Sequence, residues 1–269
     1  MMNLTHTLRK QLPALALAAG LFQAGQSEGL SFHVDQVALV ESGGSNTFSC
    51  RMVGASGAVK VYSLPVLSVE NFTLPDPATS PLDWGITNQP FATIPAWTNT
   101  VFRTVIWDGP TNDWATVGRF FVFQDQYGNN ASNIIGYWVK RVGVSTNANT
   151  LEILASPFTN NWPTNSLNHT LRLTEAAAPY GFTLYRWDVA AQAYGAPILW
   201  QTNASNQARW QSTNTNPAWL QVPPGEGLFF KNPSPYSTDV LMYGIMPLNS
   251  LTNAIPSGQS LKASLVMKT

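Results

Sequence analysis

Hydrophobic and polar residues alternate along most of this 269-residue chain in short runs, and each run ends at Gly, Pro, Asn or Asp. Alternation with a period of two is typical of β-strands, and these residue types favour the turns between strands. After residue 27 no segment keeps a helical period, so we expect helix only in short turns around Leu82 and Ser250. The sequence therefore predicts an all-β protein with little helix.

The expected strands share β-branched and aromatic residues, which are enriched in sheets. They cover residues 31–40, 46–53, 59–67, 101–107, 115–123, 134–142, 150–155, 170–173, 183–187, 218–222, 227–231, 240–245 and 260–266.

Three short motifs occur twice in the same order, which indicates an internal duplication. The copies lie 92, 80 and 91 residues apart: 63–66 with 155–158, 104–108 with 183–188, and 136–141 with 227–232. Such spacing predicts a repeated unit of roughly 90 residues. We therefore expect two tandem β-sandwich-like units, at 28–146 and 147–269, although chance resemblance between two β-rich halves is an alternative.

One repeated motif has a physical reason in hairpin geometry. Trp187 is expected to end a strand, the Asp188 carboxylate to accept backbone N–H groups of the turn, and Tyr194 to return beside Trp187 on the facing strand. The first copy has the same pattern, at Trp107, Asp108 and Trp114.

The first 27 residues have the order of a secretory signal peptide. Arg9 and Lys10 come first, an apolar run of 11 residues occupies 12–22, and small and polar residues follow at 24–27. A membrane-spanning helix needs roughly 20 apolar residues, so a retained anchor is the weaker alternative. We expect a secreted or cell-surface protein with no membrane span once the leader is removed.

Low charge distinguishes the rest of the chain. Only 10% of residues are charged, and removal of residues 1–27 leaves 12 basic and 14 acidic side chains, a net charge of −2. This balance does not favour nucleic acid or an acidic membrane as partner. The single cysteine, Cys50, excludes an internal disulfide; we expect a buried thiol, with pairing between molecules as the alternative.

The residues that neutral-pH catalysis needs are scarce. After residue 27 the only histidines are His33 and His169, and neither has the spacing of a metal site or a catalytic motif. A hydrolase built on acids such as Asp108 and Glu226 is a distant alternative. The loop 125–130 has oxygen ligands for calcium but lacks regular acid spacing, which favours a plain turn. We expect no catalytic residue, no metal and no cofactor.

Ten tryptophans raise the alternative of carbohydrate binding, because exposed rings stack on sugars. Five lie in loops where exposure is expected: Trp84, Trp97, Trp162, Trp210 and Trp219. Of these, Trp84, Trp97 and Trp162 are the candidate ligand-binding residues. Three others lie in strand patterns and are expected in the core: Trp107, Trp138 and Trp187.

Several C-terminal motifs carry a family resemblance: YRWD at 185–188, LQVPPGEGLFFKNP at 220–233, Tyr243-Gly244, and IPSGQSL at 255–261. From about residue 150 onward the chain resembles uncharacterised exported β-rich proteins of verrucomicrobial-type bacteria. The resemblance implies a β fold and export, and it transfers no catalytic residue. The N-terminal half matches this pattern only through the internal repeat.

These observations favour a non-catalytic secreted structural protein that self-assembles or decorates the cell surface as a filament, layer or matrix subunit. Its expected partners are copies of itself or other surface proteins. The alternative is an extracellular carbohydrate-binding module that holds polysaccharide through loop aromatics.

Overall fold

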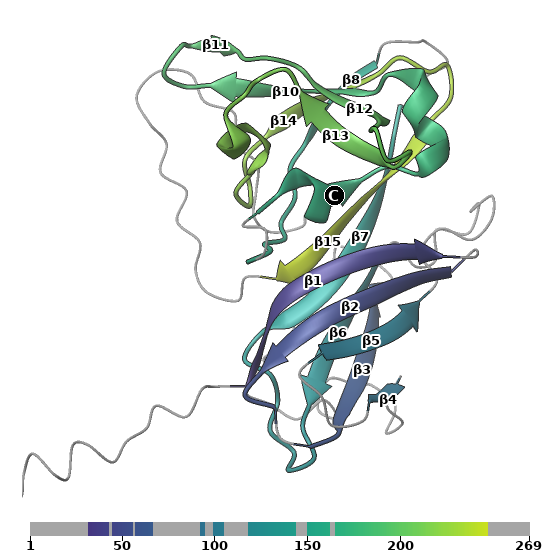
Figure 1. Ribbon diagram of the computed structural model, residues 1–269, viewed down its shortest axis with the longest axis vertical. Coiled ribbons are helices and arrows are strands. Elements are labelled where there is room, and N and C mark those ends of the chain that lie inside the picture. Colours follow the sequence, from purple (N-terminus) through teal and green to yellow (C-terminus); the bar gives the residue numbers. More distant parts are fainter. Residues whose placement is uncertain are drawn as a thin grey trace, which may run out of the picture. The chain divides into compact units, whose positions relative to one another are not determined.

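The computed structural model describes residues 32–42, 45–55, 57–66, 92–94, 99–104, 118–143, 150–161 and 165–246. Within these residues the chain forms three antiparallel sheets and three short 3-10 helices, so the all-β prediction is confirmed (Figure 1). The 3-10 helices are η2 (Leu167–His169), η3 (Glu175–Tyr180) and η4 (Pro217–Leu220).

We name the sheets by their place along the chain. The N-terminal sheet has the order β1 (His33–Ser42), β2 (Ser45–Val53), β5 (Asn99–Thr104). The central sheet has the order β4 (Ala92–Ile94), β3 (Val59–Val66), β6 (Gly118–Gln124), β7 (Ile134–Val142), β15 (Thr238–Met246), β9 (Leu171–Arg172). The C-terminal sheet has the order β13 (Ala208–Ser212), β12 (Ile198–Thr202), β10 (Thr183–Asp188), β14 (Leu228–Asn232), β8 (Thr150–Leu154), and β11 (Ala193–Tyr194) also pairs with β10.

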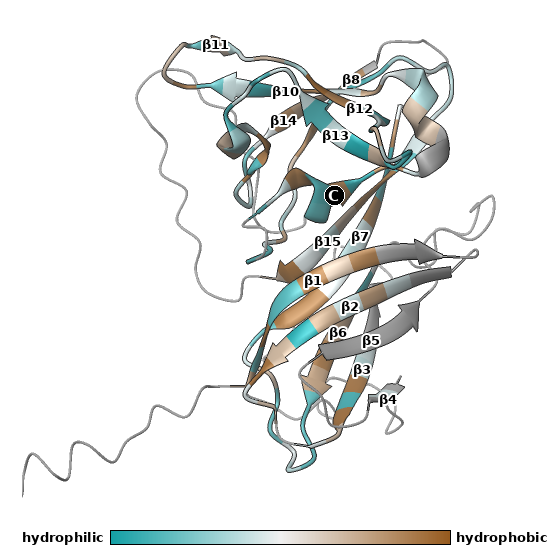
Figure 2. Ribbon diagram, in the orientation of Figure 1, coloured by the Kyte–Doolittle hydropathy of each residue, from teal (hydrophilic) through white to brown (hydrophobic). Residues whose placement is uncertain are grey.

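The central sheet is buried on both faces, which makes it the middle layer of the fold. In β6, Phe120 and Val122 belong to the core shared with the C-terminal sheet, whereas Phe121 and Phe123 belong to the core shared with the N-terminal sheet. β7 and β15 divide their side chains between the two cores in the same way. Strands buried on both faces are continuous hydrophobic runs, and Figure 2 shows hydrophobic residues along β6 and β15.

β1 keeps its hydrophobic residues on the buried face by means of a bulge. Its register against β2 shifts between Val34 and Gln36, so the buried positions change from even to odd residue numbers. Val34 therefore lies on the same buried side as Val37 and Leu39. The bulge explains why this segment departs from strict alternation.

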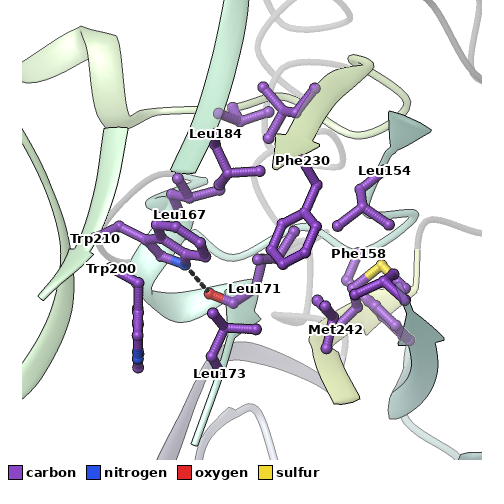
Figure 3. Close-up of a cluster of buried hydrophobic side chains, with 14 of the residues drawn as sticks. Leu154, Phe158, Leu167, Leu171, Leu173, Leu184, Trp200, Trp210, Phe230 and Met242 are labelled. Carbon is purple, nitrogen blue, oxygen red and sulfur yellow. Dashed lines mark hydrogen bonds between the residues drawn. The ribbon is translucent and has the colours of Figure 1, made fainter. Parts of the chain in front are cut away.

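Two tryptophans on neighbouring strands anchor the core between the central and C-terminal sheets. Trp200 and Trp210 are directly paired across β12 and β13, and their ring centroids are 5.2 Å apart in an edge-to-face arrangement. Trp200 Nε1 donates to the Thr174 carbonyl at 3.0 Å. Trp210 Nε1 donates to the Leu171 carbonyl at 2.8 Å, a contact that Figure 3 shows. Both indoles are thus buried with their polar atoms satisfied.

Most expected strands that fall on described residues are present, but 218–222 is not a strand. Residues 217–220 form η4 instead, because Pro217 supplies a helical φ and the Asn216 side chain accepts the Ala218 N–H at 3.0 Å. β12 and β13 were not expected. The strand expected at 260–266 and the helical turns expected around Leu82 and Ser250 lie outside the described residues.

The expected hairpin is confirmed in its second copy. β10 ends at Asp188, whose Oδ1 accepts the N–H groups of Ala190 and Ala191 at 2.9 and 3.0 Å. Trp187 pairs with Tyr194 across the turn, and their rings meet edge to face at 5.0 Å. The first copy, at residues 107–114, lies outside the described residues.

Two tandem units are not confirmed. β15, at the C-terminal end of the described chain, pairs along its whole length with β7, so strand pairing crosses the expected boundary at 146/147. The repeated motifs also differ in structure, since residues 63–66 belong to β3 whereas 155–158 follow the end of β8. The domain boundary therefore stays a prediction.

Candidate functional site

The two outer sheets present very different surfaces. On the outer face of the N-terminal sheet, paired positions of β1 and β2 include Gln36 opposite Arg51 and Ala38 opposite Ser49, with Val53 opposite His33 at the end of the pair. The outer face of the C-terminal sheet holds large apolar side chains instead. A solvated antiparallel sheet ordinarily has a polar outer face, so the second surface needs an explanation.

We call this second surface the apolar patch. It comprises Leu151 and Ile153 on β8, Phe229 on β14, Tyr185 and Trp187 on β10, and Tyr194 on β11. Leu151 is 61% exposed, Tyr194 48% and Ile153 47%. The patch crosses three neighbouring strands, because Tyr185 is paired with Phe229, and Phe229 with Ile153.

Tyr194 lies at the centre of the aromatic part of the patch. Its ring centroid is 5.0 Å from that of Trp187, 5.4 Å from that of Phe229 and 6.3 Å from that of Tyr185. All three contacts are edge to face, with interplanar angles of 82°, 83° and 70°. Edge-to-face contacts of this kind stabilise the rings against one another.

A shallow hollow of about 440 Å³ lies within the patch. Leu151, Tyr185, Tyr194 and Phe229 line it, and among the described lining residues Lys231 supplies the charged group. Lys231 is paired with Leu151 in the β14–β8 register, so its ammonium lies at the edge of the apolar surface.

A second hollow, of about 450 Å³, lies at the turn end of β10 and is more polar. Its lining includes Arg186, Asp188, Trp219 and Glu226. Arg186 makes a bidentate ion pair with Glu226, whose second contact, from Arg186 Nη2 to Glu226 Oε2, measures 2.9 Å. The Arg186 and Glu226 side chains are only 17% and 14% exposed.

The polar groups of this second hollow are engaged in holding the fold. Arg186 also donates to the carbonyls of Ala218 and Trp219, at 3.1 and 2.9 Å, and its guanidinium stacks over the Trp219 ring at 5.2 Å. Asp188 caps the β10 turn. The arrangement attaches η4 to the sheet, and it occupies both carboxylates with internal partners.

The candidate tryptophans Trp84, Trp97 and Trp162 lie outside the described residues, so their role stays a prediction. Two expectations for other tryptophans are wrong. Trp210 is buried, because it faces inward on β13, a strand that the Asn- and Thr-rich sequence did not indicate. Trp187 is only half-buried, because it lies on the outer face of β10.

Trp138 is half-buried and packs against the core between the central and C-terminal sheets, so its expected place in the core is partly confirmed. Trp219 is also half-buried. We expect it in a loop from the sequence, and it lies on the short 3-10 helix η4. One face of its ring meets Arg186, and the Gly195 backbone approaches the ring so closely that a Cβ there would lie 2.3 Å from it. This indole is therefore held between neighbours.

The loop at 125–130 is a turn closed by its own aspartate. Asp125 Oδ1 accepts the N–H groups of Tyr127 and Asn129, both at 2.9 Å, and Asp125 Oδ2 accepts from Asn129 Nδ2 at 3.0 Å. Carboxylate oxygens that accept N–H groups favour a structural role. Within the described residues, no group of three His, Cys, Asp or Glu side chains is placed to hold a metal ion.

Burial shifts the pKa of two buried groups, Cys50 and Tyr243, and of the half-buried His169. Burial raises the pKa of the Cys50 thiol, which lies in the core as expected, and burial raises the pKa of Tyr243 to about 12. Burial, with the positive charges of Arg209 and Arg172, lowers the pKa of His169. Each shift favours the neutral form of its group.

Comparison with models of protein families, with curated protein sequences and with solved structures finds no match to this chain. The resemblance to exported β-rich proteins of verrucomicrobial-type bacteria therefore stays a prediction. In the part of the chain that the structure describes, no helix has the length and hydrophobicity needed to cross a membrane.

Proposed function

We propose that this protein is a non-catalytic, exported structural protein that associates with copies of itself, or with other surface proteins, through the apolar patch. In this role it is a subunit of a filament, layer or matrix at the cell surface. The observation that carries the proposal is the apolar outer face of the C-terminal sheet, in contrast to the more polar outer face of the N-terminal sheet.

The energetics of the patch support association. Monomeric proteins rarely expose contiguous apolar surface of this kind, and such patches mark interaction sites. Full burial of an exposed Leu, Ile or Phe side chain contributes roughly 1.5–3 kcal/mol. Tyr185, Trp187 and Phe229 are already half-buried and add less, so the patch offsets part of the roughly 4–15 kcal/mol that association costs. The net charge of −2 expected for the exported chain adds little repulsion between copies.

The composition of the patch favours a protein partner over a sugar. Leu151 and Ile153 are aliphatic and are among its most exposed members. The rings around Tyr194 meet edge to face, whereas a sugar needs a flat ring face. Carbohydrate binding through Trp84, Trp97 and Trp162 remains the second candidate, and loss of retention on insoluble polysaccharide in their alanine variants would be its test.

Sedimentation velocity over a range of concentrations tests the proposal, with protein purified from the exported fraction of an expression host. We expect wild type to form species larger than the monomer, and Tyr194→Lys to shift the distribution to monomer by placing a charge at the centre of the patch. Gln201→Lys is the matched control, because Gln201 is exposed on β12 of the same sheet and lies outside the patch. A monomeric wild type at every concentration would contradict the proposal.

A further inference from the structure

The described edge strands differ in whether side chains from elsewhere in the chain bond to their backbone. An edge strand presents a row of unpaired N–H and C=O groups, which another chain can use to extend the sheet. Within the described residues, β1 is an edge of the N-terminal sheet, and β13 and β8 are the two edges of the C-terminal sheet.

Asparagine side chains close the β1 edge. Asn133 accepts the Val34 N–H at 2.9 Å and donates to the Val34 carbonyl, so its amide replaces a residue of a neighbouring strand. Asn160 makes the same pair of contacts with Val37: its Nδ2 donates to the Val37 carbonyl at 2.6 Å, and its Oδ1 accepts the Val37 N–H at 3.5 Å. The unpaired side of β1 is thereby occupied from within the molecule.

The β13 edge is closed by the same device. Asn168 Oδ1 accepts the Trp210 N–H at 2.7 Å, and Asn168 Nδ2 donates to the Trp210 carbonyl at 3.1 Å. Amide contacts of this kind satisfy the backbone groups that another chain would need. A second molecule therefore finds no free pairing at the centre of β13.

β8 carries no such closure in the part of the chain that the structure describes. It pairs only with β14, and no described side chain bonds to its backbone. It contains no proline, and its outward side chains are the exposed Leu151 and Ile153. Its one charged residue, Glu152, accepts the Gly143 N–H at 2.6 Å and lies 3.7 Å from Lys140. Prolines, outward charges and inward-pointing charges normally protect an open edge; of these β8 has the last, Glu152, whose charge is paired with Lys140.

We propose that β8 pairs in antiparallel fashion with β8 of a second copy, and that this dimer is the building block of the assembly. The proposal rests on the self-association proposed above and names the edge through which it begins. An antiparallel pair of identical strands has two-fold symmetry, the commonest symmetry of protein dimers. The apolar patches of the two copies then form one continuous surface across the joined sheets, available for stacking into larger assemblies.

The side chains of β8 suit a second copy. Antiparallel self-pairing centred on position 151 or 153 places Leu151 opposite Leu151, or Ile153 opposite Ile153, and keeps the two Glu152 carboxylates from facing each other; apolar cross-strand pairs of this kind stabilise a sheet. A strongly charged peptide gains no ion pair on this edge, because Glu152 is already engaged with Gly143 and Lys140.

Cysteine cross-linking tests the proposal in the exported full-length protein. Ile153→Cys and Leu151→Cys place a thiol on β8, and Gln201→Cys places one on β12 of the same sheet as a control. In a two-fold antiparallel pair a residue lies directly opposite its own copy only at the axis, where the two Cβ atoms are about 4.5–5.5 Å apart, within reach of a short bis-maleimide linker or a disulfide. Cys50 does not compete, because it is buried and its pKa is raised.

We expect the covalent dimer to be the main product of the β8 variant whose cysteine lies at the two-fold axis, position 151 or 153, and a minor product of Gln201→Cys. Positions 151 and 153 are exposed, so the variants are expected to fold, and near-ultraviolet circular dichroism of the tryptophans checks this. If wild type associates in sedimentation while the β8 variants cross-link no more than the control, β8 pairing is overturned and self-association stands. If wild type is monomeric throughout, both proposals fail.

One further experiment distinguishes pairing of β8 with a second copy from pairing of β8 with another segment of the same chain. If the strand expected at 260–266 lay on β8 in the same molecule, cross-linking of the β8 variants would appear only after residues 258–269 were removed. That result would also overturn the proposal. Equal cross-linking with and without these residues supports it.

Discussion

Replacement of Asn160 by alanine removes the most deeply buried of the amide contacts that close the β1 edge. The Asn160 side chain is 0% exposed, and its amide is the partner of both the N–H and the carbonyl of Val37. Alanine leaves these two backbone groups without a partner in a region where Val37 itself is 0% exposed. Water therefore cannot readily replace the lost contacts.

The expected destabilisation follows from these two groups. A buried backbone group without a partner costs about 1–3 kcal/mol; since the Val37 N–H contact is long, we expect a total of about 2–4 kcal/mol. For a domain of this size each kcal/mol lowers Tm by about 2–4 °C, which gives a decrease of about 4–16 °C. Thermal unfolding followed by circular dichroism measures it.

Asn203→Ala is the matched control for this prediction. The Asn203 side chain also accepts two backbone N–H groups, from Ser205 and Gln207 at 2.9 Å each, but these lie in an exposed turn where water can replace it. We expect a loss of less than about 1 kcal/mol there. If Asn160→Ala lowered Tm no more than Asn203→Ala, the asparagine would not be a structural partner of β1.

Three further changes test other parts of the structure. The pKa of His169 is lowered in the folded state, so its contribution to stability is complete above about pH 6.5 and is lost as the pH falls toward the folded pKa. We expect His169→Gln to remove this part of the pH dependence of unfolding. An unchanged pH dependence in the variant would contradict this prediction. Glu226→Gln should lower stability in urea by about 1–3 kcal/mol, because the Arg186 ion pair that holds η4 is weakened; a midpoint equal to that of wild type would mean that the pair contributes nothing. Gly136→Ala should prevent stable folding, because the added Cβ would lie 2.6 Å from the Arg119 carbonyl oxygen of the neighbouring strand. At Gly128 an added Cβ would meet no atom within 4 Å, so Gly128→Ala should lose only about 1–2 kcal/mol of folding stability through its positive φ. Similar expression and Tm for the two variants would refute this reason.

The sequence predicts the strands of the central sheet well, because hydrophobic runs such as 120–123 and 240–243 are long and lie between clear turns. It fails at β12 and β13, where only two inward residues per strand, such as Trp200 and Trp210, rise above an amide-rich background. It also does not reveal that β15 returns to β7, since that pairing joins residues 96 or more positions apart.

The apolar patch could not be predicted because alternation in its strands does not identify the buried set. In β8 the apolar pair Leu151 and Ile153 faces outward, whereas Glu152 and Leu154 lie on the other face. In β14 Phe230 is buried while Phe229 is on the outer face. A strand with apolar residues on both faces that proves to lie at the edge of an outer sheet is the signal for such a surface.

Electron microscopy of the exported protein, with wild type and Tyr194→Lys prepared side by side, tests the central claim most directly. We expect ordered filaments or layers from wild type and only dispersed particles from the variant. Dispersed monomers from wild type at every salt concentration and pH, or ordered assemblies that persist unchanged in Tyr194→Lys, would contradict assembly through the apolar patch.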